Sequence, residues 1–147
     1  QEPDAEDEGA VEEALRDTGI SALADRPVDH LAGGERSLAL LARAFATRPS
    51  VLLADEPVQG LDPAHALQVM ELFRKTAHGG RGILVVLHDL TLAARFCDRL
   101  VLLHRGRIIA QGRPEEVLTS ENLVRTYGIE AKYGADDFYV VPWRTVP

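Results

Sequence analysis

A short apolar run that ends in two acids constrains the fold of this chain more than any other feature, and it reads Val51-Leu52-Leu53-Ala54-Asp55-Glu56. Four consecutive apolar residues are typical of a parallel strand that is buried on both faces. Open α/β sheets bind their ligands at the carboxyl ends of their strands, where the two acids lie. A carboxylate there can hold a magnesium ion, and its neighbour can polarise an attacking water. The pattern also fits a strand that ends in solvated acids, so both interpretations stay open at this point.

Helical periodicity and capping residues predict longer helices at about residues 4–19, 33–48 and 62–79. Asp4 is expected to cap the first helix and Gly19 to end it, and Asp62 is expected to cap the third. Four apolar side chains share one face of the second helix, namely Leu38, Leu41, Ala42 and Phe45. A second apolar run, Ile83 to Leu87, predicts another strand buried on both faces, and Asp89 caps a short helix after it. Strands that alternate with helices in this way predict an α/β fold with a parallel sheet.

The last third of the chain is predicted to form shorter strands and helices. They are two strands at 100–103 and 107–110 joined by a tight turn at Arg105-Gly106, then short helices that begin at Pro114 and Thr119. Gly128 is expected to end the second of these helices. The tail from Ile129 is rich in aromatic and β-prone residues, and its arrangement is left open.

Composition limits the classes of function. The length of 147 residues corresponds to a single domain, and 46% of the residues are hydrophobic and 27% are charged. No apolar run approaches the roughly 20 residues that span a bilayer, and the acidic start has no signal-peptide pattern. The net charge of −7 comes from acids gathered before residue 14, so no basic face predicts binding to nucleic acid. A single cysteine, Cys97, excludes an internal disulfide.

Three further patterns accompany the acidic pair. Leu31-Ala32-Gly33-Gly34-Glu35 opens a helix upstream, and paired glycines at a helix start let backbone N–H groups approach a phosphate closely. Gly60-Leu61-Asp62-Pro63 follows the acids after a short gap, and His88 ends the next apolar strand. Each pattern is weak by itself, because a glycine pair is also a common loop and a lone histidine is more often a surface residue.

In this order and at these separations, the four patterns resemble the signature motif, Walker B motif, D-loop and H-loop of the ATP-binding cassette (ABC) ATPases. The resemblance implies a P-loop NTPase-type parallel sheet with flanking helices, and ATP and Mg²⁺ as cofactors. It also implies that Asp55 binds the magnesium ion and that Glu56 is the catalytic base. His88 would contact the γ-phosphate and hold the attacking water together with Glu56.

The resemblance further implies a second ATPase subunit, because the family works as a head-to-tail two-fold dimer. Asp62 would communicate with that partner across the dimer. The signature residues would bind the γ-phosphate of ATP held by the other subunit, and they are Leu31, Ala32, Gly33, Gly34 and Glu35.

Two positions depart from the family's pattern. Position 32 is usually serine and is Ala32 here, which removes a hydroxyl donor to the γ-phosphate while the backbone amides remain. Leu38 stands where the family usually has arginine. Both changes bear on how strongly the signature motif binds phosphate. They do not alter its assignment as the signature motif.

The phosphate-binding P-loop of the family is not found in the sequence. Its pattern needs a lysine behind a glycine, and the only lysines, Lys75 and Lys132, do not fit it. We therefore expect the chain to be a fragment whose sheet lacks the P-loop strand and the N-terminal part. Residues 1–50 would belong to the helical subdomain with the signature motif, and residues 51–147 to the C-terminal part of the RecA-like ATPase core with its tail. The strands on either side of the missing one, Ile83 to Leu87 and Leu100 to Leu103, would then have unpaired edges. Such edges favour self-association of the chain, and the alternative is that the two strands pair directly and close the gap.

Phrases such as Leu87-His88-Asp89-Leu90 and Glu121-Asn122-Leu123 resemble the branch that imports iron-siderophore complexes, haem or cobalamin. Such a subunit would work with an integral-membrane permease, as a peripheral protein at the cytoplasmic face of the inner membrane. The parent protein would be a transport-coupled ATPase, and the chain alone would be inactive. Two alternatives stay open: the ATPase of a non-transport ABC protein, and a non-catalytic cassette half that acts as an interaction module.

Overall fold

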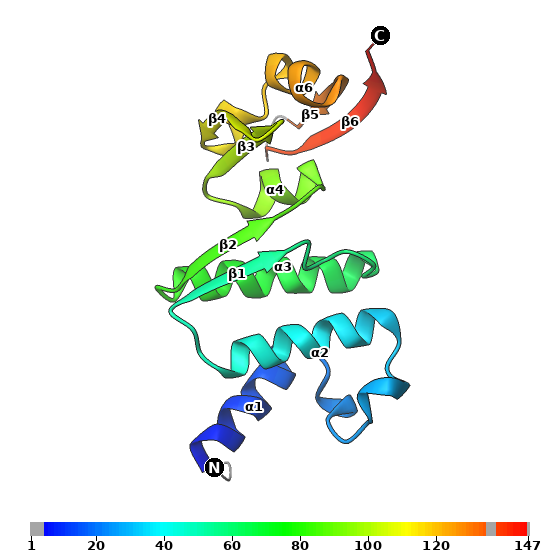
Figure 1. Ribbon diagram of the computed structural model, residues 1–147, viewed down its shortest axis with the longest axis vertical. Coiled ribbons are helices and arrows are strands. Elements are labelled where there is room, and N and C mark those ends of the chain that lie inside the picture. Colours follow the sequence, from blue (N-terminus) through cyan, green and yellow to red (C-terminus); the bar gives the residue numbers. More distant parts are fainter. Residues whose placement is uncertain (1–4, 135–137, 147) are drawn as a thin grey trace. The chain divides into compact units, whose positions relative to one another are not determined.

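The computed structural model describes residues 5–134 and 138–146, and the expected cap residue Asp4 lies outside them. The chain divides into two compact units, Gln1–Val86 and Leu87–Pro147, and each is described by itself (Figure 1). The predicted division at residue 50 concerns the domains of a whole ATPase, and it stays a prediction.

The first unit combines helices with a small parallel sheet. Its elements are α1 (Ala5–Asp17), α2 (Gly33–Ala46), β1 (Val51–Asp55), α3 (Pro63–His78) and β2 (Gly82–Val86), with 3₁₀ turns at Ser21–Leu23 and Val28–His30. The longer helices predicted from periodicity are confirmed. Gly19 follows the end of α1 with a φ of 75°, a left-handed conformation that favours glycine. Local chemistry therefore sets where these helices end.

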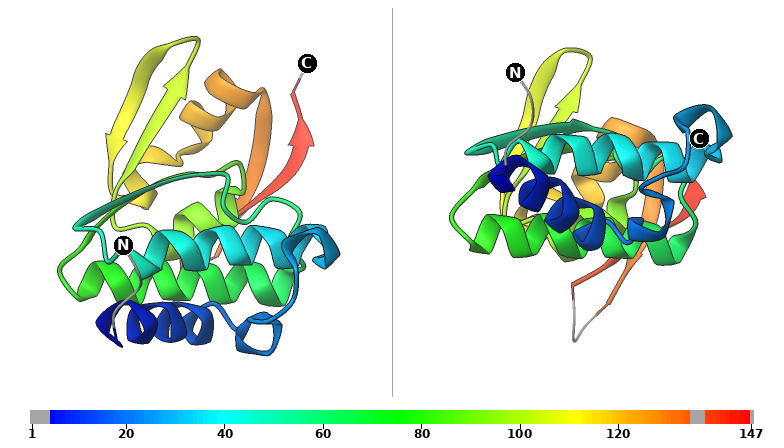
Figure 2. Two further views of the ribbon diagram at one scale, coloured as in Figure 1. Left: turned by 60° about the horizontal axis from the view of Figure 1, so that its bottom comes forward. Right: turned by 90° about the horizontal axis from the view of Figure 1, so that it is seen from below.

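The apolar faces of α2 and α3 form the core of the first unit. The side chains predicted to share one face of α2 are all buried, and they are Leu38, Leu41, Ala42 and Phe45. The buried side chains of α3 are Val69, Met70, Leu72 and Phe73. Phe45 and Phe73 meet with ring centroids 6.0 Å apart, and Figure 2 shows the two helices side by side in both views. The prediction of a buried apolar face on α2 is thus confirmed.

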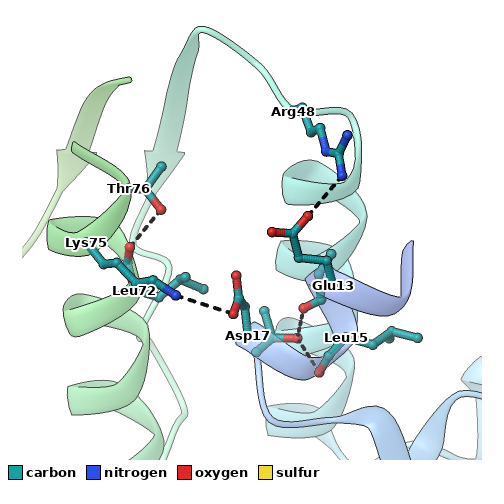
Figure 3. A network of polar contacts seen from close by, with 9 residues as sticks. Glu13, Leu15, Asp17, Arg48, Leu72, Lys75 and Thr76 are labelled. Atoms are coloured by element: carbon teal, nitrogen blue, oxygen red, sulfur yellow. Dashed lines mark hydrogen bonds and ion pairs between the residues drawn. The ribbon is translucent and has the colours of Figure 1, made fainter. Parts of the chain in front are cut away.

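Ion pairs connect α1 to its neighbours, and two of them are drawn in Figure 3. Arg48 Nη2, just after α2, donates to Glu13 Oε2 at 3.0 Å, and Lys75 Nζ of α3 lies 3.7 Å from Asp17 Oδ1. Pairs between such largely exposed side chains contribute about 0–1 kcal/mol each. The ion pairs therefore add little stability of their own, and the apolar side chains that α1 buries are Ala10 and Ala14.

The parallel sheet of the first unit has one open face. β1 pairs with β2 so that Val51 lies opposite Gly82 and Asp55 opposite Val86. The prediction that both strands are buried on two faces is wrong. The open face consists of Val51, Leu53, Leu84 and Val86, whose exposed fractions are 58%, 71%, 63% and 49%. The alternate residues are half-buried and α3 contacts β2, whereas no described element of this unit covers the open face.

The second unit is built from two β-hairpins and short helices. Its elements are α4 (Leu90–Phe96), β3 (Leu100–His104), β4 (Arg107–Gly112), α5 (Pro114–Val117), α6 (Ser120–Tyr127), β5 (Ile129–Tyr133) and β6 (Val140–Thr145). β3 and β4 pair antiparallel around Arg105 and Gly106, whose φ values of 48° and 74° suit a two-residue hairpin turn. Gly128 ends α6 with a φ of 64°. The predicted hairpin and both helices are confirmed.

The tail, whose arrangement the sequence left open, forms the antiparallel pair β5–β6. Thr91 Oγ1 of α4 donates to the carbonyl of Val140 in β6 at 2.7 Å. The core of this unit consists of Leu90, Ala94, Leu118, Leu123 and Val140. The tail is therefore part of the second unit's core. None of the helices that the structure describes is both long and apolar enough to cross a membrane.

Candidate functional site

The glycine pair stands at the very start of α2. Ala32 is the N-cap, and its carbonyl accepts the first helical hydrogen bond from the N–H of Arg36 at 2.9 Å. The N–H groups of Gly33, Gly34 and Glu35 therefore belong to the first turn, which has no partners within its own helix. These amides and the helix dipole make the start of α2 suitable for an anion.

The fold does not require a glycine at position 33. Its φ is not among the positive values, and a Cβ built on it would meet nothing within 4 Å. The residue is also exposed. Neither backbone strain nor packing in the described residues thus explains the missing side chain. A ligand that must approach the backbone closely would explain it.

Leu31 and Glu35 fix the loop in front of α2. Leu31 is buried, at 8% exposed. The Ala32 N–H donates to Glu35 Oε2 at 2.7 Å, and Glu35 Oε1 lies 3.8 Å from Arg26 Nη1. Because alanine has no side-chain acceptor, only this half of a capping box can form. The departure at position 32 therefore leaves the helix start partly uncapped.

The loop Gly60–Asp62 lies beside Gly34, the second glycine of the pair. A Cβ on Gly34 would lie 3.4 Å from Leu61 Cδ2 and 3.8 Å from the carbonyl oxygen of Gly60. The first unit thus brings together two of the motifs that the sequence singled out. The start of α2 therefore lies close to the segment between β1 and α3.

The two acids occupy the carboxyl end of β1, as predicted. Asp55 is the last residue of the strand and is exposed. The N–H of Glu56 donates to the carbonyl of Val86 at 3.1 Å, although Glu56 has a φ of 48°. A left-handed conformation costs about 1–2 kcal/mol in a residue other than glycine. Such strain is concentrated at functional sites, because the surrounding structure must maintain it.

Asp55 suits a magnesium ion that arrives together with phosphate. The described residues contain no group of three or more His, Cys, Asp or Glu side chains that could hold a metal ion by themselves. Mg²⁺ commonly takes one or two carboxylates and completes its octahedron with waters and substrate phosphates. A single exposed carboxylate at a strand end fits that pattern of coordination.

Asp62 caps α3, as the sequence predicts. Its Oδ1 accepts from the N–H groups of Ala64 at 2.9 Å and His65 at 3.1 Å, and Pro63 occupies the first helical position. Its Oδ2 is hydrogen-bonded to Nδ1 of His65. The hydrogen bond from the His65 ring, then the one from the His65 backbone N–H, holds the pKa of the Asp62 carboxyl below its usual range.

His88 belongs to the second unit, where it is exposed and precedes the N-cap of α4. That cap is Asp89, whose Oδ1 accepts from the N–H of Leu92 at 2.9 Å, as predicted. The predicted action of His88 together with Glu56 stays a prediction.

Sequence reasoning missed two features of the site. The pairing of His65 with Asp62 had a signal, since residues at the N-cap and three positions later lie side by side at a helix start. The left-handed conformation of Glu56 had none, because glutamate is not a residue that favours positive φ.

The start of the chain, residues 1–59, matches a family model described as ABC transporter. A hemin import ATP-binding protein of Rhodococcus jostii is 47% identical over 123 residues, which are 84% of this chain and 42% of the relative. The ferric enterobactin transport ATP-binding protein of Escherichia coli K12 is 42% identical over 125 residues, or 84% of this chain and 46% of the relative. The chain spans about half the length of the curated relatives it matches.

The solved structures that are similar in fold to this chain include ATP-binding cassettes of ABC transporters. An ATP-binding cassette of an ABC transporter in its ADP conformation superimposes with a TM-score of 0.74 and 29% identity, over 86% of this chain and 51% of that one. A dimeric bacterial ABC transporter cassette gives a TM-score of 0.70 and 27% identity, over 78% of this chain and 50% of that one. The α/β fold class is thereby confirmed. By its sequence and by its fold, the chain belongs to the ABC transporter family, among the ATP-binding cassettes.

Proposed function

We propose that the chain is the part of an ABC transporter ATP-binding subunit that supplies a catalytic acid pair and a γ-phosphate-binding helix start. Asp55 binds Mg²⁺ and Glu56 acts as the general base on the attacking water. The amides of Gly33 and Gly34 bind the γ-phosphate of ATP held by a second subunit, and His88 contacts a γ-phosphate. The subunit couples ATP hydrolysis to import.

The observation that carries this proposal is Gly33. An exposed glycine at the start of a long helix, without positive φ and without neighbours around its Cβ position, serves no visible purpose within the fold. It does serve the approach of an anion to bare backbone N–H groups. The contact of Gly34 with the loop Gly60–Asp62 supports the same site, because it ties that helix start to the segment that follows Glu56.

The partners that we propose are a second copy of the subunit and an integral-membrane permease. A cassette in the structural comparison is dimeric, and a head-to-tail dimer would place one subunit's glycine pair against the other's nucleotide. The subunit would then be peripheral, at the cytoplasmic face of the membrane. Relatives of the chain are named for import of hemin or for transport of ferric enterobactin or achromobactin, which favours haem or an iron-siderophore complex as cargo.

The proposal is tested with Gly33→Ala in a subunit of the relatives' length that contains this segment. Gly9 is a matched control, because it also lies in a helix, is exposed, and has nothing within 4 Å of its Cβ position. Replacing either glycine with alanine should leave the melting temperature unchanged or slightly raised, since alanine is the better helix former.

Only Gly33→Ala should weaken ATP-driven dimerisation and ATPase activity, measured by sedimentation and phosphate release. Equal activity of the Gly33→Ala and Gly9→Ala variants would refute the role of the glycine pair.

A further inference from the structure

Hydrogen bonds within the first turn of α3 occupy most of the acceptor positions of the Asp62 carboxylate. Its Oδ1 accepts two backbone N–H groups, and its Oδ2 is hydrogen-bonded to the His65 ring. An ionised carboxylate offers about four lone-pair positions. Three of them are engaged here, so a group from outside would meet only one, in a fixed direction.

Capping alone does not require the His65 ring. An aspartate caps a helix through one oxygen that accepts from the second or third N–H group, and the other oxygen can remain in water. Both side chains lie at the surface, with exposed fractions of 47% for His65 and 56% for Asp62. The ring therefore adds a constraint on the orientation of the carboxylate beyond what the helix start needs.

That orientation bears on the loop between Glu56 and Asp62. The loop is internally bonded, with the N–H of Gln59 donating to the carbonyl of Glu56 at 3.0 Å and that of Leu61 to Val58 at 3.2 Å. Its beginning is held by the bond from Glu56 to the β2 strand, and its end by the Asp62 cap. The residues next to that cap, Gly60 and Leu61, are the ones that lie beside Gly34.

We propose that His65 is a positioning residue, which fixes the Asp62 carboxylate and through it the position of Gly60 and Leu61 beside Gly34. The proposal deepens the proposed function and rests on it for its catalytic consequence. Because Glu56 is held separately by its bond to Val86, loss of the ring should disturb phosphate binding by the glycine pair more than the chemical step.

Three variants test whether His65 positions the Asp62 carboxylate or only makes a surface contact with it. His65→Ala removes the bond to Oδ2. His65→Gln keeps a donor, because a glutamine three residues after the cap can reach back toward it. His78→Ala is the matched control, since it removes an exposed histidine from the other end of the same helix.

The first measurement uses NMR on the chain alone and does not depend on ATPase activity. The hydrogen bond to Asp62 predicts that neutral His65 carries its proton on Nδ1, which the ¹⁵N shifts of the ring report. The amide signals of Gly34, Gly60 and Leu61 should shift in His65→Ala, return in His65→Gln and stay unchanged in His78→Ala. A neutral ring with its proton on Nε2, or unchanged signals in His65→Ala, would overturn the proposal.

The second measurement takes ATPase kinetics in a subunit of the relatives' length. His65→Ala should raise KM for ATP about two- to fivefold, the range of a surface charge-assisted contact, with little change in kcat. His65→Gln should restore KM, and His78→Ala should match the wild type. If the wild-type subunit hydrolyses no ATP, the proposed function fails, and the amide signals still decide the positioning role. If the wild type is active and His65→Ala matches it, the positioning role fails alone.

Discussion

The backbone N–H of Glu56 donates to the carbonyl of Val86 at 3.1 Å, so a bond from the residue just after β1 to the end of β2 holds the residue that we propose as catalytic base. The same residue turns the chain out of the strand with a φ of 48°. The sheet thus fixes Glu56 on one side, while a strained turn directs the chain away on the other. Substitutions at Glu56 can therefore separate the role of its carboxylate from the energetic cost of its backbone conformation.

Glu56→Gln and Glu56→Gly should both abolish turnover for the same chemical reason, but differ in stability. General-base catalysis contributes about 10²- to 10⁴-fold, so the ATPase rate of either variant should fall by that factor, with nucleotide binding kept in Glu56→Gln. Glycine accepts positive φ without cost, so Glu56→Gly alone should raise the melting temperature. Phosphate release and thermal unfolding in a subunit of the relatives' length measure both. Near-normal turnover in Glu56→Gln would contradict the assignment.

Leu38 has become a core residue in this chain, although arginine is usual at its position in the family. It is 3% exposed, whereas Leu40 of the same helix is 60% exposed. Leu38→Ala should lower the free energy of unfolding by about 2–5 kcal/mol, the cost of truncating a buried leucine. The matched change Leu40→Ala should stay within about 0.5 kcal/mol. Urea unfolding of the chain measures both, and equal losses would mean that Leu38 does not pack as described.

The helix ends could be predicted from the sequence because each depends on neighbouring residues, as with the Asp62 cap and the glycines at 19 and 128. The acid pair at the end of β1 was predictable for the same reason, since an apolar run shows where its strand stops. The open face of the sheet was not, because an apolar run without alternation is the same whether one face or both are covered. The contact of Gly34 with Leu61 joins segments far apart in sequence, and no local pattern encodes it.

Ala32→Ser should strengthen the start of α2. Ala32 has the backbone conformation of an N-cap but no side-chain acceptor. A serine hydroxyl could accept from the N–H of Glu35 and complete the capping box, which is worth about 1 kcal/mol. The melting temperature should rise by about 2–4 °C. The matched variant Ala39→Ser, in the middle of the same helix, should lower it slightly.

The same hydroxyl can still donate its proton to a phosphate. In a hydrolysis-deficient subunit of the relatives' length, Ala32→Ser should therefore also strengthen ATP-driven dimerisation. A hydrogen bond to a charged group is worth about 1.5–3 kcal/mol. An unchanged dimer constant together with a raised melting temperature would limit serine to the capping role.

The open face of the parallel sheet should make the chain alone self-associate. Leu53 and Leu84 lie on that face and are 71% and 63% exposed, and contiguous exposed apolar surface promotes association. Light scattering over a concentration series should show dimers or larger species, which Leu53→Lys should reduce. Leu40→Lys, which changes a leucine of α2 that is 60% exposed, should not reduce them. A monomer at every concentration would contradict the expectation.

The central claim is that the glycine pair of one subunit and Glu56 of the other serve the same nucleotide. Mixing two inactive subunits of the relatives' length, one with Gly33→Asp and one with Glu56→Gln, tests it most directly. In a head-to-tail dimer the mixed pair contains one site with both an intact Glu56 and an intact glycine pair, so an equal mixture should regain roughly a quarter of the wild-type ATPase activity. If both groups acted on a nucleotide within one subunit, the mixture would stay as inactive as its parts.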